Sequence, residues 1–315
     1  MTTSTSPRVP TRDLTLLALT AVVIFWASAF VGIRAVSDVF DPGPLALGRL
    51  AVGALALALI ARPWRHRMPR GRTLVLVVVY GIAWFGLYNI ALNAAEVTLD
   101  AGTTALVVNI GPILIALGAG IFLSEGFPRP LMVGMAISFA GVVLIAASTR
   151  DPSGVATTSI VGVVLAVGAA LLYAVGALVQ KPTLAAVDPS MSVWLACTVG
   201  AVVCLPFAPR LTEQLGRADA ADVGWLVYLG VFPTAIGFAA WAYASKRLTS
   251  GQVASTTYLV PAVTTLISWV LLAEIPAALA FAGGGLCLIG VAVTRWRSRP
   301  ATGRRSGRPP PWRAL

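Results

Sequence analysis

The sequence predicts an all-α integral membrane protein whose ten transmembrane helices form two inverted five-helix repeats. Charged residues make up 11% of the 315 residues and hydrophobic residues 57%, whereas soluble domains carry roughly 25% charged residues. A chain with so few charges cannot cover a water-facing surface, and its hydrophobicity also excludes disorder. Apolar intervals of spanning length and an internal repeat are the two further observations that predict this class.

The apolar intervals succeed one another along nearly the whole chain. Each is close to the ~20 residues that a helix needs to cross a ~30 Å hydrocarbon core. Backbone groups in lipid are satisfied only within helices or closed barrels, and the ~10-residue alternation of barrel strands is not visible. The expected spans are 14–33, 44–61, 73–95, 101–124, 130–149, 152–180, 189–209, 223–245, 248–273 and 275–294.

Lys and Arg are divided unevenly between the loops of this topology. If the amino terminus is cytoplasmic, 18 of the 23 Lys and Arg residues fall on the cytoplasmic side, as the positive-inside rule requires. We therefore expect the cytoplasmic (inner) membrane, with both termini in the cytoplasm. Ala27-Ser28-Ala29 is compatible with a signal-peptide cleavage site, but the apolar run continues to Ile33, which favours a retained span.

The net charge of +11 is concentrated in the loop 62–72 and in the tail that follows the last span. The tail, 296–315, is rich in Arg, Pro and Gly, so we expect it to be disordered and attracted to anionic lipid headgroups. Because the excess charge serves orientation and this tail, nucleic-acid binding is not expected.

An internal repeat relates the two halves of the chain. A shift of 149 residues aligns more than 60 positions without a gap, and a shift of 147 aligns the starts of the halves, pairing Arg34 with Lys181. An odd number of helices per repeat inverts the second repeat in the membrane, which is a transporter architecture. We expect a tail (1–13), a first repeat (14–148), an external linker (149–158), a second repeat (159–295) and the basic tail. Matched residues include Gly81 with Gly230, Pro112 with Pro261, Glu125 with Glu274, Gly134 with Gly283 and Gly141 with Gly290.

Two long runs carry a resemblance to a known family. They read LNAAEVTLDAGTTALVVNIGPILIALGAGIFLSE and YASKRLTSGQVASTTYLVPAVTTLISWVLLAEIP. They resemble the paired modules of EamA-type transporters of the drug/metabolite transporter superfamily. The resemblance implies ten helices, export of a small metabolite, amino acid or drug, and no ATPase. It also implies a central cavity between the first, third, fourth, sixth, eighth and ninth helices, with the fifth and tenth closing the bundle.

Residues for catalysis or metal binding are not evident. The three Cys residues lie in apolar intervals without C-x-x-C spacing, so neither a metal site nor a disulfide is indicated. His66 stands alone among arginines in the loop 62–72, and no G-x-S-x-G or P-loop motif occurs. We expect no enzyme activity and no cofactor.

Proline and glycine mark special positions within the spans. Pro112 and Pro261 fall mid-span, where each removes a backbone hydrogen bond, so we expect two kinked helices at a cavity. Packing kinks are the alternative. The glycine pairs seven residues apart, Gly134 with Gly141 and their repeat partners, lie on one helix face and predict close packing, between the fifth and tenth helices in this topology.

Polar and aromatic side chains inside the spans are the candidate binding residues. Trp84, Tyr88 and Asn93 belong to a stripe with near four-residue spacing on the third span, together with Tyr80 and Asn89. Such a lining suits an amphipathic solute, zwitterionic or cationic. Interhelical hydrogen bonding is the alternative reading of each residue. The remaining candidates are Trp241 on the eighth span and the repeat-related pair Asn109 and Tyr258.

Two charged residues near the outer ends of spans, Glu96 and Arg49, have more than one expected role. Glu96 can bind an amine or carry a coupling proton, cap the next helix, or pair with Arg49. Arg49 lies about one turn and a half into its span, close enough to extend outward or to contact Glu96 or Asp41. Glu125 and Glu274 end repeat-related helices, where pairing with a loop or helix start is expected.

The predicted function is export of small metabolites or amino acids from the cytoplasm by alternating access between the repeats. A multidrug exporter is the alternative within this class, and a non-transporting membrane scaffold or sensor is the alternative outside it. Proton coupling and facilitated diffusion both stay open. The expected partners are a small-molecule substrate and the lipid bilayer, with a homodimer possible.

Overall fold

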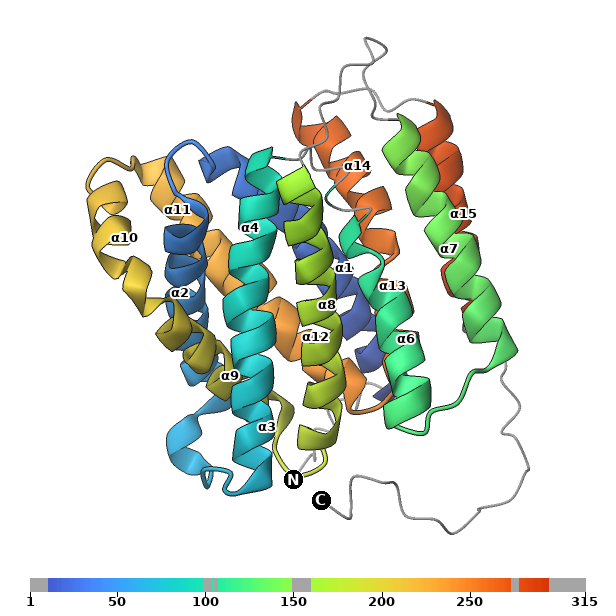
Figure 1. The fold of residues 1–315 in the computed structure, drawn as a ribbon, viewed down its shortest axis with the longest axis horizontal. Helices are drawn as coiled ribbons and strands as arrows, with labels where there is room; N and C mark the ends of the chain where they lie inside the picture. Colours follow the sequence, from blue (N-terminus) through green and yellow to red (C-terminus); the bar gives the residue numbers. More distant parts are fainter. Residues whose placement is uncertain (1–10, 99–103, 105–106, 149–159, 273–277, 295–315) are drawn as a thin grey trace, which may run out of the picture.

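The computed structural model describes residues 11–98, 104, 107–148, 160–272 and 278–294, and within these residues every regular element is helical. Figure 1 shows the helices side by side in one bundle, with α7 and α15 together at one edge. The elements of the first half are α1 (Thr11–Val36), α2 (Pro42–Ala61), η1 (Pro63–Arg65), α3 (Arg72–Tyr80), η2 (Gly81–Leu87), α4 (Tyr88–Thr98), α6 (Gly111–Phe122) and α7 (Arg129–Ser148). Those of the second half are α8 (Ile160–Thr183), α9 (Pro189–Cys204), η3 (Leu205–Phe207), α10 (Ala208–Leu215), α11 (Ala220–Leu229), η4 (Gly230–Gly237), α12 (Phe238–Ser245), α13 (Ser250–Thr256), α14 (Leu259–Leu272) and α15 (Ala278–Thr294).

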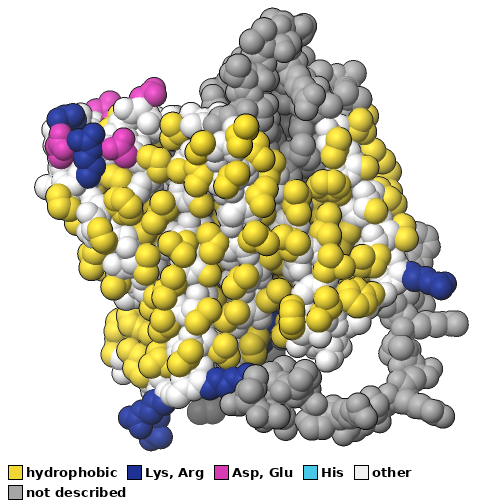
Figure 2. Space-filling view, viewed as in Figure 1, with side chains coloured by type: hydrophobic (Ala, Val, Ile, Leu, Met, Phe, Trp, Pro, Cys, Tyr) yellow, Lys and Arg dark blue, Asp and Glu magenta, His cyan; other side chains and the backbone are white. Residues whose placement is uncertain are grey.

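Six helical stretches of the described chain are long and apolar enough to cross a membrane. Figure 2 shows one face of the bundle covered by hydrophobic side chains, with charged groups towards its ends. Leu55, Leu59 and Val164 are among the large apolar residues that the bundle leaves exposed, as expected of a surface that faces lipid. The six stretches are Asp13–Ile33, Pro42–Arg65, Arg72–Thr98, Ile160–Thr183, Pro189–Leu215 and Ala220–Ser245, and two shorter apolar helices are Gly111–Phe122 and Ala282–Thr294.

A π-helical turn interrupts one long helix in each half, at η2 and at η4. The two turns begin at Gly81 and Gly230, which are 149 residues apart. A π turn accommodates one residue more than an α turn, so it rotates everything that follows about the helix axis. The sequence analysis did not anticipate either turn.

The π turns pack against the opposite half in matching ways. A Cβ placed on Gly81 would lie 2.9 Å from the carbonyl oxygen of Ala196, and one on Gly230 would lie 2.9 Å from that of Arg49. Ala196 and Arg49 are themselves related by the shift of 147. The backbones of the two halves therefore make equivalent close approaches that only glycine permits.

Helices α7 and α15 make a reciprocal contact, as the glycine spacing predicted. A Cβ on Gly134 would lie 2.5 Å from the carbonyl oxygen of Gly290, and one on Gly141 would lie 2.5 Å from that of Gly283. The residue number rises along one helix as it falls along the other, so the helices are antiparallel. The predicted packing of these glycines between the two helices is confirmed.

The centre of this contact brings together two residues that the repeat itself relates. Ser138 Oγ donates to the Cys287 carbonyl (3.3 Å), and Cys287 Sγ donates to the Ser138 carbonyl (3.5 Å). Ser138 and Cys287 are 149 residues apart. The contact between these two residues is therefore reciprocal.

The helix of each mid-span proline is interrupted just before the proline, at the place where the sequence predicts a kink. Pro112 lies in the first turn of α6, after a turn at Asn109–Ile110, and Pro261 is the third residue of α14, after a turn at Thr257–Tyr258. A first-turn position suits proline, because its missing N–H has no intrahelical acceptor there.

Glu125 fixes the beginning of α13, as expected of a helix-ending carboxylate. Its two carboxylate oxygens accept hydrogen bonds from the backbone N–H (2.7 Å) and the hydroxyl (2.8 Å) of Ser250. The bond joins the two halves at one end of the bundle. The repeat partner of Glu125, Glu274, lies outside the described residues.

Candidate functional site

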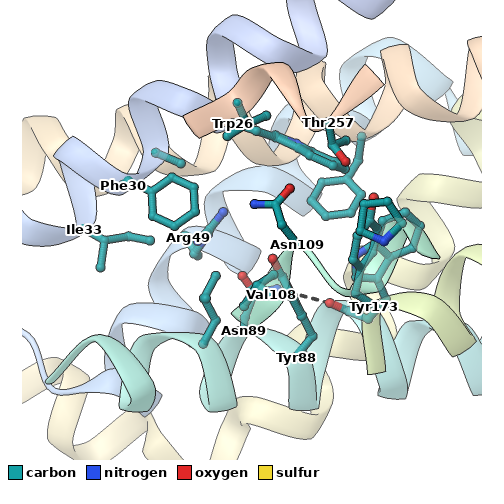
Figure 3. A pocket seen from close by; sticks show the side chains of 16 residues that line it. Trp26, Phe30, Ile33, Arg49, Tyr88, Asn89, Val108, Asn109, Tyr173 and Thr257 are labelled. Atoms are coloured by element: carbon teal, nitrogen blue, oxygen red, sulfur yellow. Dashed lines mark hydrogen bonds between the residues drawn. The ribbon is translucent and has the colours of Figure 1, made fainter. Parts of the chain in front are cut away.

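A cavity lies at the centre of the bundle, where helices from both halves meet (Figure 3). Its volume is about 70 Å³, room for only a few water molecules. Side chains of α1, α2, η2, α4, α6, α8, α12 and α14, and of the two turns before α6 and α14, line it. They are Trp26, Ala29, Phe30, Ile33, Arg49, Trp84, Tyr88, Asn89, Leu92, Val108, Asn109, Pro112, Tyr173, Phe238, Thr257 and Val260.

Aromatic rings form one wall of the cavity. Trp26 meets Trp84 edge-on, with 6.3 Å between the ring centroids, and Tyr173 lies 5.2 Å from Trp84. Phe238 lies 5.0 Å from Trp84, again edge-on. These separations are those of favourable aromatic pairs, so the rings hold one another in place and present apolar faces to the cavity.

Local backbone features position these rings. Gly176 lies against Trp84, where an added Cβ would be 2.4 Å from the Trp84 Cβ, so α8 can approach the indole only because it carries glycine there. The Trp26 Nε1–H donates to the carbonyl of Pro233 (3.3 Å) in the π turn η4. This bond fixes the Trp26 indole and satisfies a donor that would otherwise be buried unpaired.

Arg49 extends into the cavity, so the expectation that it extends outward or pairs with Asp41 was wrong, while Glu96 acts on it electrostatically. Its side chain is 5% exposed, and its Nε donates to Thr234 Oγ1 (3.2 Å). Thr234 in turn donates to the carbonyl of Leu229 (2.8 Å). The ion pairs found within the described residues are Arg210–Asp41, Arg210–Glu213 and Arg217–Glu213, so none includes Arg49.

Two amides add polar groups to the lining. Asn89 Nδ2 donates to the Phe85 carbonyl (2.7 Å), an oxygen within the π turn η2. Asn109 precedes α6 at the interruption of that helix, and Figure 3 shows its amide projecting between Arg49 and Thr257. The cavity thus combines apolar faces with a few polar groups and one cation, which is the composition of a small-molecule site.

The structure brings together only some of the residues singled out from the sequence. Trp84, Tyr88, Asn109 and Pro112 line the cavity, whereas Asn93, Glu96, Trp241, Tyr258 and Pro261 are not among its lining residues.

Asn93 and Trp241 support the site from outside it. Asn93 Nδ2 donates to the Pro42 carbonyl (3.0 Å) and so fixes the beginning of α2. Trp241 stacks on Trp26, with 5.1 Å between the ring centroids.

Tyr258 and Glu96 lie away from the lining. Tyr258 is fully buried in a separate cluster with Met135 and Cys287, beside α7 and α15. The Glu96 carboxylate is buried one helical turn beyond the lining residue Leu92.

Four residues that line the cavity were not predicted from the sequence: Trp26, Tyr173, Phe238 and Thr257. One signal was available: Trp26 and Tyr173 are paired by the shift of 147, so two aromatic residues occupy one repeat position. Phe238 and Thr257 carry no such signal, because their inward direction depends on the π turn and on the interruption before α14.

Comparisons with known proteins agree with this architecture. The model of the EamA-like transporter family matches residues 14–147 and 160–296. A probable terminal-alkyne amino-acid exporter of Streptantibioticus cattleyicolor is 36% identical over 281 residues, covering 89% of this chain and 93% of the relative. A probable amino-acid metabolite efflux pump of Escherichia coli is 26% identical, covering 90% and 96%.

One solved crystal structure has a similar fold, with a TM-score of 0.73 at 20% sequence identity, covering 90% of this chain and 96% of the other. The family match covers both halves of the chain, and the similar relatives are transporters and exporters. The chain is therefore a multi-pass membrane transporter, not an enzyme, and it belongs to the EamA-like transporter family.

Proposed function

We propose that this protein exports small metabolites or amino acids from the cytoplasm by alternating access between two inverted five-helix repeats. The observation that carries the proposal is the central cavity, which both halves line and which holds a buried cation among aromatic rings. A volume of about 70 Å³ is well below the roughly 300 Å³ of a small-molecule pocket. Binding and release therefore require the helices around the cavity to move.

The proposed architecture has ten spans, with repeats at 14–148 and 159–295. Its support is the antiparallel, reciprocal contact of α7 with α15, which fits a two-fold axis perpendicular to the helices. Two interrupted helices at the cavity are a further feature of transporters with inverted repeats. Such symmetry lets each half adopt the conformation of the other, and this exchange produces two access states.

We propose an inner-membrane location with both termini in the cytoplasm. The support is the distribution of basic residues under the positive-inside rule. The loop between α2 and α3 is basic. At the other end of α2, Asp41 lies with α10 and its residue Glu213, and Figure 2 shows acidic side chains gathered around α10.

The solute class is inferred from the relatives, two of which are named for amino acids or their metabolites. A test compares extracellular metabolites of cells with and without overexpression, followed by efflux of each enriched solute from proteoliposomes. Efflux faster than from protein-free liposomes is expected. A chain that enriches no solute and carries none of a standard amino-acid panel would be a scaffold or sensor, and the proposal would fail. Resistance to hydrophobic cationic drugs without any amino-acid efflux would favour the multidrug alternative.

A further inference from the structure

Arg49 alone carries a charge among the described residues that line the cavity. A charged side chain within a membrane span is costly, by at least ~2.5 kcal/mol near the bilayer centre, and such residues mark substrate paths. The charge of Arg49 therefore makes it a candidate solute-binding residue.

The guanidinium is held in one orientation. Its Nε is fixed by Thr234, whose own hydroxyl proton goes to the Leu229 carbonyl. The two terminal nitrogens make no hydrogen bond to the described part of the chain. In Figure 3 the end of the side chain points into the cavity between Phe30 and Asn109. Four N–H donors are thus presented to the cavity as a planar fork.

The surroundings of Arg49 do not neutralise it by direct contact. Glu96 acts on it electrostatically, but the ion pairs between described residues join Arg210 or Arg217 to Asp41 or Glu213 and do not include Arg49. A buried guanidinium in this condition is stabilised strongly by an anion that can accept two parallel hydrogen bonds.

We propose that the cavity selects solutes with a single carboxylate, which binds the Arg49 fork while an apolar tail lies against Trp26, Trp84 and Tyr173. This inference deepens the proposed export function and rests on it. The class includes zwitterionic amino acids and excludes solutes that are only cationic, because an amine at this point meets a like charge. It narrows the sequence-based expectation of a zwitterionic or cationic solute.

A carboxylate fits better than a phosphate. One arginine balances one negative charge, whereas a dianionic phosphate would leave a second charge buried without a partner, at a high desolvation cost. The repeat position of Arg49 in the second half is Ala196, so the repeat supplies no second cation.

The test measures binding to the purified full-length protein through its tryptophan fluorescence, since Trp26 and Trp84 line the cavity. The probes are L-norvaline, pentanoate, L-norvalinamide, n-butylamine and propylphosphonate. We expect L-norvaline and pentanoate to bind roughly 10- to 100-fold more tightly than the amide and the amine, as loss of a charge-assisted pair predicts. Phosphonate binding as tight as that of pentanoate, or equal binding of all five probes, would overturn the inference.

Variants assign the preference to Arg49. In Arg49→Gln the carboxylates should lose that advantage while n-butylamine binding does not weaken, and Arg49→Lys should restore only part of it, because an ammonium lacks the fork. Thr234→Val keeps the charge but frees Nε, so a several-fold loss confined to carboxylates is expected even if Arg49→Gln fails to fold. Arg210→Gln, at an exposed ion pair, is the matched control and should leave every affinity unchanged.

Transport separates this inference from the export function. If an enriched solute still leaves proteoliposomes at the wild-type rate in Arg49→Gln, the carboxylate site is wrong and export stands. If no solute is carried by the wild-type protein, although carboxylates bind as described, export fails while the binding site remains.

Discussion

Two regions that the repeat relates, α2 against η4 and α9 against η2, have the same backbone contact and different side chains. Arg49 and Ala196 present their carbonyl oxygens to Gly230 and Gly81 at matching distances. Yet Arg49 reaches the cavity and bonds Thr234, whereas its counterpart is an alanine and the counterpart of Thr234 is Phe85. Symmetry is kept where backbones pack and lost where side chains meet the cavity.

A second pair of regions shows the same loss of symmetry at the two ends of the bundle. The Tyr80 hydroxyl and Ser192 Oγ are 2.7 Å apart, and Ser192 Oγ lies 3.2 Å from Thr183 Oγ1, beside buried Gln180. The repeat equivalents of these four residues are wholly apolar and pack into one hydrophobic cluster. They are Leu229, Leu45, Val36 and Ile33. One end of the bundle thus holds a buried polar cluster at the positions where the other end holds an apolar one.

The repeat-related residues Asn109 and Tyr258 offer the strongest contrast. Tyr258→Ala should destabilise the protein by roughly 3–5 kcal/mol, as loss of a buried aromatic ring does, and should lower membrane abundance. Asn109→Ala should instead reduce transport at normal abundance, because that amide lines the cavity. Membrane abundance and efflux of both variants check this prediction. A Tyr258→Ala protein that is abundant but inactive would indicate that Tyr258 takes part in solute binding.

The next largest loss of stability is expected at the glycines between α7 and α15. Gly134→Ala should cost about 1–3 kcal/mol, seen as a lower melting temperature, because the methyl group would meet the Gly290 carbonyl. Gly168→Ala on α8 is the control, since nothing lies within 4 Å of its added Cβ, and helix propensity predicts a neutral or stabilising effect. Equal destabilisation by both changes would contradict the close contact.

A smaller loss of stability is expected when the polar cluster around Tyr80 loses its tyrosine hydroxyl. Tyr80→Phe removes the bonds to Ser192 and should cost about 1 kcal/mol. Tyr243→Phe is the comparison, because the Tyr243 ring meets Arg247 through its face, and phenylalanine keeps that face. Thermal unfolding of the two variants in detergent checks the difference, and a larger loss for Tyr243→Phe would count against the cluster.

The exposed ion pair of Arg210 with Asp41 should give the smallest effect. Both side chains are about half exposed, and solvent and salt screen such pairs. Arg210→Gln should leave abundance and efflux unchanged within error at physiological salt. A clear loss of efflux would show that contact between α2 and α10 controls the transport cycle.

The sequence predicted features that depend on residue identity alone. The repeat follows from the spacing of Gly, Pro and Glu, and the seven-residue glycine spacing gave the α7–α15 contact. Which side chains of a helix face the cavity was harder to predict, because this depends on the rotation of the helix about its own axis. Trp84, Tyr88 and Asn89 line the cavity, whereas Asn93, one turn beyond Asn89 in α4, does not and instead donates to the Pro42 carbonyl. Arg49 was ambiguous because a long side chain near a helix end can extend either way.

Only the first of the two repeat-related positions, Arg49 and Ala196, carries arginine. This difference limits what an ancestor made of two separate, identical subunits could have bound. The self-complementary contact through Ser138 and Cys287 is one that two copies of a five-helix unit would make with each other. Two identical copies, however, would carry arginine at the position of Ala196 as well, and a second unpaired cation would be buried in the same small bundle. Joining the copies in one polypeptide removes that constraint, so a one-carboxylate site is accessible to a fused gene and closed to a homodimer of repeats.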